Sequence, residues 1–87
     1  MNRNGMHPVH PGEILSDEFL KPLGMTVEAL ARSLNEPEAD VSVVVNQKGG
    51  VSFGLAQKLS FQLNTTPEFW LSLQSTYDLR SAQFERG

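Results

Sequence analysis

The 87-residue sequence contains no cysteine, only one tryptophan and one tyrosine, and no long apolar run. Without cysteine, the chain has neither the disulfides that stabilise many small secreted domains nor a thiolate metal site. Its apolar runs are far shorter than the roughly 20 residues of a membrane span, and the N-terminal stretch lacks the apolar core of a signal peptide. These absences predict a single small domain in the cytoplasm.

Basic residues are also scarce, with seven against ten acidic residues and a formal net charge of -3. This balance argues against nucleic-acid binding, because phosphate contacts depend on Lys and Arg side chains. Any DNA binding must therefore come from a local arrangement of a few cations and helix N-termini, together with a second subunit.

Residues 26 to 45 have the apolar spacing of two short helices that meet at a sharp turn. Ala31 stands where the two helices must touch, and Asn35 stands where the chain must turn, because Asn tolerates a left-handed backbone. The pattern predicts a helix-turn-helix, in which the first helix crosses the DNA backbone and the second enters the major groove. A helical hairpin that only packs within the domain is the alternative. The apolar positions that carry the pattern are Leu30, Ala31, Leu34, Val41, Val44 and Val45.

The rest of the chain also predicts helices, bounded by recognisable caps. A first helix should start at Pro11, with His10 as its cap, and end at Pro22. Ser52 and Thr66 are the caps expected for the last two helices. With the pair in residues 26 to 45, this makes five helices and no strand, preceded by a flexible arm at residues 1 to 9.

Metal and enzyme chemistry are not expected. His7, His10 and Glu13 are spaced three apart, but the prolines between them break the helix that would bring the three together. No nucleophile lies beside a His at helical spacing, and Gly49-Gly50 lacks the pattern of a phosphate-binding loop. The sequence therefore predicts no metal, no cofactor and no catalytic residue.

Four runs in the chain resemble the HigA-type antitoxins, the VapI-like branch of the XRE helix-turn-helix superfamily. They are His-Pro-Gly-Glu-Ile-Leu at 10 to 15, Pro-Leu-Gly-Met at 22 to 25, Leu-Ala at 30 to 31, and Thr-Pro-Glu-Phe-Trp-Leu-Ser-Leu-Gln-Ser-Thr-Tyr-Asp-Leu at 66 to 79. The resemblance implies an all-α, five-helix, lambda-repressor-like DNA-binding domain at residues 10 to 87. It also implies a homodimeric antitoxin that represses its own operator, pairs with a RelE-like, HigB-type toxin, avoids membranes and catalyses nothing.

Mapping the motif onto this chain gives a set of candidate DNA contacts. Lys48 is the best phosphate contact, in a stretch similar to the family's Asn-Gly-Lys. Arg32 could reach phosphate or pair with Glu28 one turn away. The full candidate set is Thr26, Arg32, Glu38, Ala39, Asp40, Ser42, Val43, Asn46, Gln47 and Lys48.

Some residues depart from the family pattern. Glu36 occupies a turn position that is usually apolar, and Glu38 and Asp40 place negative charge where the helix would approach DNA. Acidic side chains can accept from the cytosine amino group but are costly near phosphates. Gly49-Gly50 replaces an often basic position and is expected to loosen the loop. An alternative function follows, a protein-interaction module of the same fold that holds a toxin without binding DNA.

The last helix is long for so small a protein and should pack partly on a second copy. Phe69 and Trp70 are expected in the core, and Tyr77 at its rim. The candidate dimer contacts are Leu71, Gln74, Leu79 and Phe84.

Overall fold

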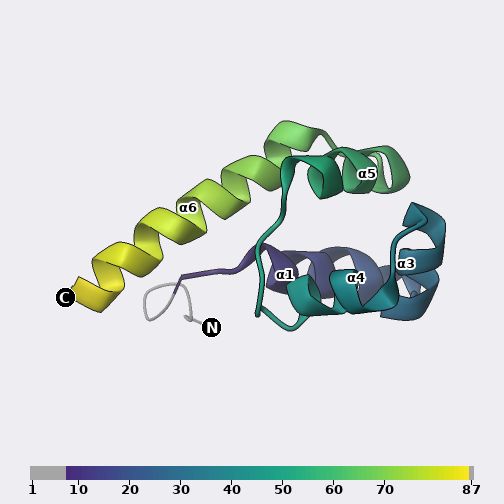
Figure 1. The fold of residues 1–87 in the computed structure, drawn as a ribbon, viewed down its shortest axis with the longest axis horizontal. Helices are drawn as coiled ribbons and strands as arrows, with labels where there is room; N and C mark the ends of the chain where they lie inside the picture. The colour runs from purple at the N-terminus through teal and green to yellow at the C-terminus, as the bar shows by residue number, and fades with distance from the viewer. Residues whose placement is uncertain (1–7, 87) are drawn as a thin grey trace.

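The computed structural model describes residues 8 to 86, which are helical with short connections (Figure 1). Three segments follow one another without a break at the start of the chain, and four separate helices come after them. The prediction of five helices without strands is confirmed for the described residues, the first helix being the three joined segments. The elements are α1 (Pro11–Ile14), η2 (Leu15–Leu20), α2 (Lys21–Leu23), α3 (Val27–Leu34), α4 (Glu38–Val45), α5 (Phe53–Leu63) and α6 (Pro67–Arg86).

The first helix begins at Pro11 and is capped by a buried histidine. The Gly12 N–H donates to Nδ1 of His10 at 2.8 Å, which confirms the predicted cap. His10 is only 2% exposed, and its ring meets the Tyr77 ring edge-on, with centroids 4.7 Å apart. Burial lowers the pKa of His10, although a hydrogen bond to the Gly49 backbone and the charges of Asp78 and Glu13 act in the opposite direction. His10 therefore joins the start of α1 to α6 as a neutral ring.

The middle of the first helix widens into a π-turn at η2, where the Lys21 N–H donates to the Ser16 carbonyl. Pro22 follows at once, and its ring would crowd the carbonyl four residues earlier in a regular α-helix. The helix continues one residue beyond the predicted stop at Pro22. It ends at Gly24, which has a left-handed backbone with φ of 64°.

Left-handed residues also cap the C-termini of α3 and α5. Asn35 has φ of 59°, as the sequence predicts, and the Glu36 N–H closes the turn on the Ala31 carbonyl at 3.0 Å. Asn64 ends α5 with φ of 59°. This arrangement satisfies the last carbonyls of each helix within a few residues, so the connections stay short.

The core is built around Trp70, which is fully buried. Its indole N–H donates to the Thr65 hydroxyl at 2.7 Å, and the Phe19 and Phe69 rings lie against it. The prediction for Trp70 is confirmed, whereas Phe69 is 38% exposed and covers the edge of the core instead of filling it. The buried apolar residues are Leu15, Leu20, Leu30, Ala31, Leu34, Val41, Val44, Val51, Ala56, Leu59 and Trp70.

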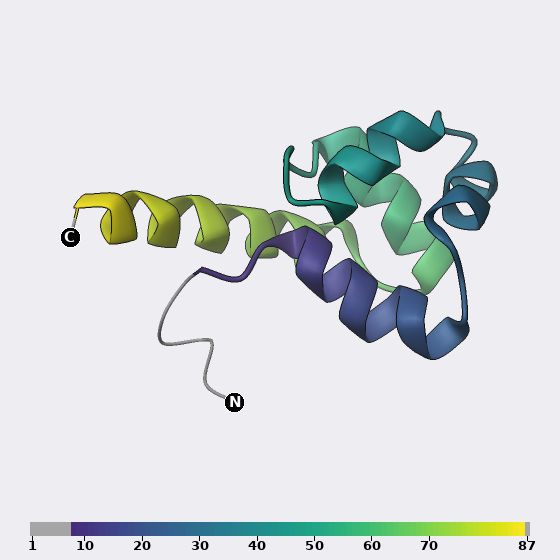
Figure 2. The same cartoon turned by 90° about the horizontal axis from the view of Figure 1, so that it is seen from below.

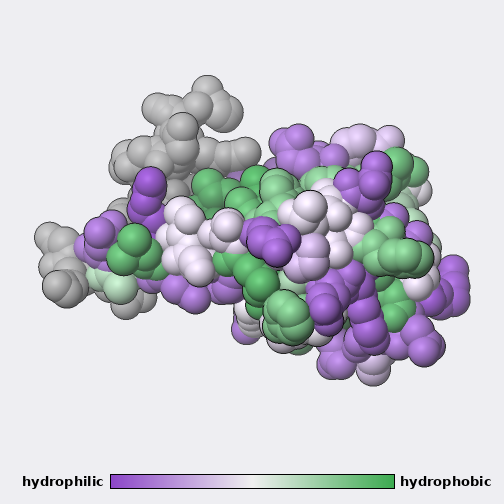
Figure 3. All heavy atoms as spheres, turned by 90° about the horizontal axis from the view of Figure 1, so that it is seen from above, coloured by the Kyte–Doolittle hydropathy of each residue, from purple (hydrophilic) through white to green (hydrophobic). Residues whose placement is uncertain are grey.

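Helix α6 packs on α5 and on α1 near its start, and its C-terminal half projects away from the other helices (Figures 1 and 2). The projection gives the molecule a long axis of 40 Å against 26 and 22 Å. Seen from the side of α5 and α6, apolar surface is broken into separate patches among polar side chains (Figure 3). The expected packing of α6 on a second copy stays a prediction.

Within residues 8 to 86, no helix combines the length and apolar character needed to cross a membrane. The predicted arm falls, apart from Pro8 and Val9, outside the described residues, as does His7. The described residues also contain no cluster of His, Asp and Glu that could hold a metal ion.

The buried His10 cap predicts acid sensitivity. Because the pKa of His10 is lowered in the folded state, the unfolded chain binds more protons, and stability should be lost as the pH falls below about 6.5. Urea unfolding at pH 7.5 and 5.5 should show this loss for the wild type. His10→Asn keeps a capping side chain that does not titrate in this range, so it should flatten the dependence. An equally steep dependence in the Asn variant would contradict the assignment.

Candidate nucleic-acid interface

Helices α3 and α4 form a tight wedge whose contact residues are small or branched. Ala31 is 2% exposed and Val41 is 1% exposed, so the helices meet through side chains that permit a close approach. The start of α1 supports the far end of α4. A Cβ on Gly12 would lie 1.9 Å from the Val44 carbonyl oxygen, so only glycine fits there. This role of Gly12 was not anticipated from the sequence, which gave it only a place in a helix entry.

The outer face of α4 is open to solvent. Glu38, Ala39 and Asp40 are exposed in its first turn, Val43 is 43% exposed, and Ser42 is half-buried. Asn46, one turn beyond Ser42, donates its side-chain N–H to the Ser42 hydroxyl at 3.1 Å. The helix therefore presents a mixed acidic, hydroxyl and apolar surface.

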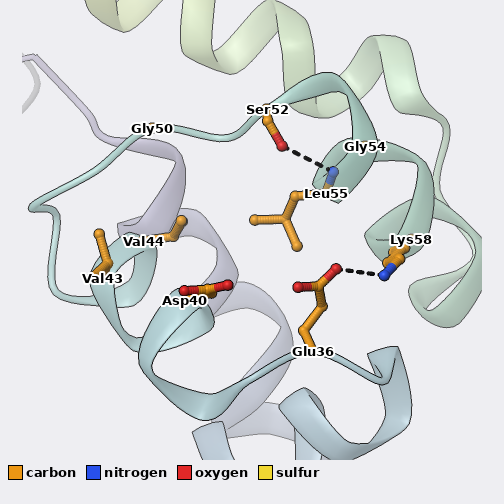
Figure 4. A pocket seen from close by; sticks show the side chains of 9 residues that line it. All are labelled: Glu36, Asp40, Val43, Val44, Gly50, Ser52, Gly54, Leu55 and Lys58. Atoms are coloured by element: carbon orange, nitrogen blue, oxygen red, sulfur yellow. Dashed lines mark hydrogen bonds and ion pairs between the residues drawn. The ribbon is translucent and has the colours of Figure 1, made fainter.

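A groove of about 460 Å³ runs between α4 and the start of α5 (Figure 4). Leu55 and Val44 form part of its floor, and the carboxylates of Glu36 and Asp40 point into it. Its lining residues are Glu36, Asp40, Val43, Val44, Gly50, Ser52, Gly54, Leu55 and Lys58.

The acidic turn residue Glu36 is paired across this groove. Its carboxylate forms an ion pair with the ammonium of Lys58, which joins the turn of the helix-turn-helix to α5. The turn is thus joined to α5 by a charged contact. Asp40 lies in the same groove, so the lining carries two carboxylates and one ammonium.

The N-terminus of α5 was missed as a possible anchor. Ser52 caps α5 as predicted, accepting from the Leu55 N–H at 3.1 Å, and a Cβ on Gly54 would meet nothing within 4 Å. Free N–H groups of this first turn therefore border the groove without a covering side chain. The signal available in the sequence was a glycine in the first turn of a helix directly after the loop.

The side chains predicted to contact phosphate differ in their hydrogen bonds and ion pairs within the protein. Thr26 caps α3 by accepting from the Ala29 N–H at 3.0 Å, so its hydroxyl oxygen is engaged while its O–H can still donate. Arg32 pairs with Glu28 at 3.3 Å, as the sequence allowed. Lys48 is exposed and forms no ion pair within residues 8 to 86. Of the two candidate cations, Lys48 is therefore the more available to a phosphate.

The loop from Asn46 to Ser52, called the anchor loop below, is packed and not loosened by its glycines. A Cβ on Gly49 would lie 2.4 Å from Cγ1 of Val43, and one on Gly50 would lie 3.0 Å from Oε1 of Gln74. The Val51 N–H donates to the same Gln74 oxygen at 2.8 Å. The expectation of a loose loop is wrong, because both glycines permit close contacts.

The second residue of the anchor loop, Gln47, lies in the left-handed region at φ of 64°. The Gln47 N–H donates to the Val44 carbonyl at 3.0 Å, and the Lys48 N–H donates to the Val43 carbonyl at 2.8 Å. These bonds fix the direction in which Lys48 leaves α4. Glycine adopts this backbone without strain, whereas the side chain of Gln47 does not.

Comparison with curated proteins finds relatives whose sequences match most of the chain. The antitoxin HigA-1 of Vibrio cholerae is 42% identical over 80 residues, a match that covers 91% of this chain and 74% of that protein. The chain belongs to the HigA-type antitoxin family. Virulence-associated protein I of Dichelobacter nodosus is 33% identical over 84 residues, covering 97% of this chain and 78% of that protein. No protein-family model matches the chain.

Solved structures agree with this membership. The antitoxin GraA superposes with a TM-score of 0.91 at 49% identity, covering 95% of this chain and 89% of that one. Pseudomonas aeruginosa antitoxin HigA, solved with the higBA promoter, superposes with a TM-score of 0.89 at 40% identity, covering 93% and 88%. The helix-turn-helix of this HigA-type chain therefore has the fold of an antitoxin that was solved with promoter DNA.

The predicted dimer contacts of this HigA-type chain have unequal surroundings. Leu71 is half-buried and packs against the core, and the Gln74 amide is bonded within the chain. Leu79 is 60% exposed and is the most available of the set. The side chain of Phe84 lies outside the described residues.

Relieving the left-handed strain at Gln47 should stabilise the protein. Gln47→Gly is expected to raise the free energy of unfolding by about 1 kcal/mol, because a side chain at positive φ costs roughly that amount. Gln47→Ala removes the same amide but keeps a Cβ, so it should give no gain. Chemical denaturation of the three proteins measures the difference, and equal gains in Gly and Ala would contradict the strain.

Proposed function

We propose that this chain is an antitoxin and a sequence-specific DNA-binding repressor of its own toxin-antitoxin operon. The observation that carries the proposal is the open outer face of α4, bordered by a groove and by Lys48, which is exposed and has no ion pair within residues 8 to 86. The same fold in Pseudomonas aeruginosa HigA has been solved with promoter DNA. Family membership and exposed geometry therefore support one function.

In this proposal α4 enters the major groove. Glu38, Ala39, Asp40, Ser42 and Val43 face base edges, where carboxylates accept from cytosine amino groups and the Val43 methyls contact thymine methyls. Such contacts give specificity, and they tolerate negative charge because cytosine offers a donor.

Phosphate contacts then supply most of the affinity. Lys48 and Gln47 contact the backbone on one side of α4, and the N-terminus of α3 after Thr26 contacts it on the other. Asn46 and Arg32 complete the candidate set, and the open first turn of α5 at Gly54 adds backbone donors. With only a few cations, we expect operator binding that is weaker than is typical of the family.

The proposed partners of this chain are a second copy of the same chain and a toxin. A dimer formed through α6 places two α4 helices on one duplex, as repressors of this architecture require. The toxin would be a RelE-like, HigB-type protein, which this chain binds without catalysing a reaction itself. The proposed place of action is the cytoplasm, where the operator lies.

Operator binding tests the function directly. The wild type should bind its own promoter fragment with a sequence preference and an affinity that falls steeply between 50 and 200 mM salt. Lys48→Ala should weaken binding about 5- to 10-fold and reduce the salt slope by about 1 for each Lys that is lost. Fluorescence anisotropy at several salt concentrations measures both effects.

Lys21→Ala is the matched control, because Lys21 is an exposed cation on the first helix that already pairs with Asp17 at 3.0 Å. It should change the affinity and the slope little. If the wild type holds a toxin and shows no preference for its promoter, the repressor function is wrong and the toxin-holding module replaces it.

The proposed dimer predicts the effect of removing an exposed apolar side chain from α6. Leu79→Ser should weaken self-association about 10-fold or more, because a buried Leu contributes roughly 1.5 to 3 kcal/mol. Leu23→Ser is a matched control, since Leu23 is 62% exposed at the end of α2. Sedimentation equilibrium separates the two, and similar association in both variants would remove Leu79 from the interface.

A further inference from the structure

One side chain of α6, the half-buried Gln74, holds the anchor loop by a hydrogen bond. Oε1 of Gln74 accepts from the Val51 N–H at 2.8 Å, and its amide nitrogen donates to the Asp78 carboxylate at 2.9 Å. Because an ionised carboxylate only accepts, Asp78 orients the amide so that its oxygen faces the loop. The orientation of Gln74 is therefore set by its neighbour one turn along α6.

The loop backbone fits closely against this amide. Gly50 lies so near that an added Cβ would be 3.0 Å from the Gln74 oxygen, and the Val51 side chain is 5% exposed. Water competes poorly for a backbone N–H at a buried residue, so the bond that this N–H donates to the half-buried amide oxygen holds the loop in one place. Gln74 thus fixes the end of the anchor loop opposite to Gln47.

A second tie lies beside the first on α6. Tyr77, three residues from Gln74, contacts the His10 ring edge-on. The Gly49 backbone interacts with the same ring, where it acts to raise the pKa of His10 against the lowering by burial. The two signature runs at residues 10 to 15 and 66 to 79 therefore meet on Gly49, Gly50 and Val51. These three residues directly follow Lys48, the more available of the two candidate cations.

We propose that Gln74 is a positioning residue for operator binding, which sets the anchor loop so that Gln47 and Lys48 reach phosphate. The inference rests on the proposed repressor function. A loop that is ordered before binding does not lose its conformational freedom on the DNA, so preorganisation raises affinity without a new contact. Gln74 itself does not touch DNA in this arrangement.

The first test replaces the amide by an apolar side chain of similar size. Gln74→Leu should weaken operator binding about 5- to 10-fold while the protein stays folded and keeps its oligomeric state. Amide hydrogen exchange at Val51 should become faster in the same variant, because the N–H loses its acceptor. Since Gln74 was also predicted as a dimer contact, sedimentation of each variant is part of the experiment.

Exchanging the amide and the carboxylate between positions 74 and 78 should restore operator binding. In the double variant with Gln74→Glu and Asp78→Asn, the new carboxylate can accept both from the Val51 N–H and from the new amide, and the net charge is unchanged. Operator affinity and Val51 protection should return towards the wild-type values. Gln74→Glu alone faces the Asp78 charge and should recover less.

A double-mutant cycle separates positioning from general stability. If Gln74 acts through Lys48, the loss of operator affinity caused by Gln74→Leu should be clearly smaller in the Lys48→Ala background. The inference would be overturned if Gln74→Leu reduced operator affinity equally in both backgrounds or bound with wild-type affinity. It would also be overturned if the affinity fell only because the dimer dissociated. Failure of the wild type to bind its promoter would instead overturn the proposed function, so the two failures are distinguishable.

Discussion

The backbone contact between Gly12 and Val44 sets the position of the whole recognition surface. Glycine lets the first turn of α1 lie directly on the last turn of α4, at a distance that excludes any side chain. His10 makes this approach possible by capping the Gly12 N–H, and its ring is held by Tyr77 of α6. The orientation of α4 therefore depends on both ends of the chain, although the helix-turn-helix occupies only its middle.

Much of the fold could be predicted from the sequence because its helix boundaries carry local signals. Caps at His10, Thr26, Ser52 and Thr66 act on N–H groups only a few residues away, and Asn35 turns the chain by its own backbone preference. Such signals need no knowledge of distant contacts. Phe69 was misplaced for the opposite reason, since helical spacing alone does not tell a central residue from one at the edge of the core.

The site was less predictable because its geometry comes from contacts between distant segments. The bond between Val51 and Gln74 spans 23 residues, and the pair formed by Glu36 and Lys58 spans 22. The glycines of the anchor loop looked permissive in sequence, yet each of them makes room for a particular side chain, Val43 or Gln74. The exposure of α4 could be predicted, whereas the rigidity of the loop that follows it could not.

The carboxylate partners of Arg32 and Lys58 have a thermodynamic consequence for any polyanion that docks here. A phosphate that contacts either cation competes with Glu28 or Glu36, so binding becomes partly an exchange of one anion for another. Losing the attraction to the carboxylate offsets part of the free energy gained when condensed cations leave the duplex. The carboxylates of the protein therefore compete with the phosphates of the duplex. As a result, the number of cations overstates the electrostatic driving force for DNA binding.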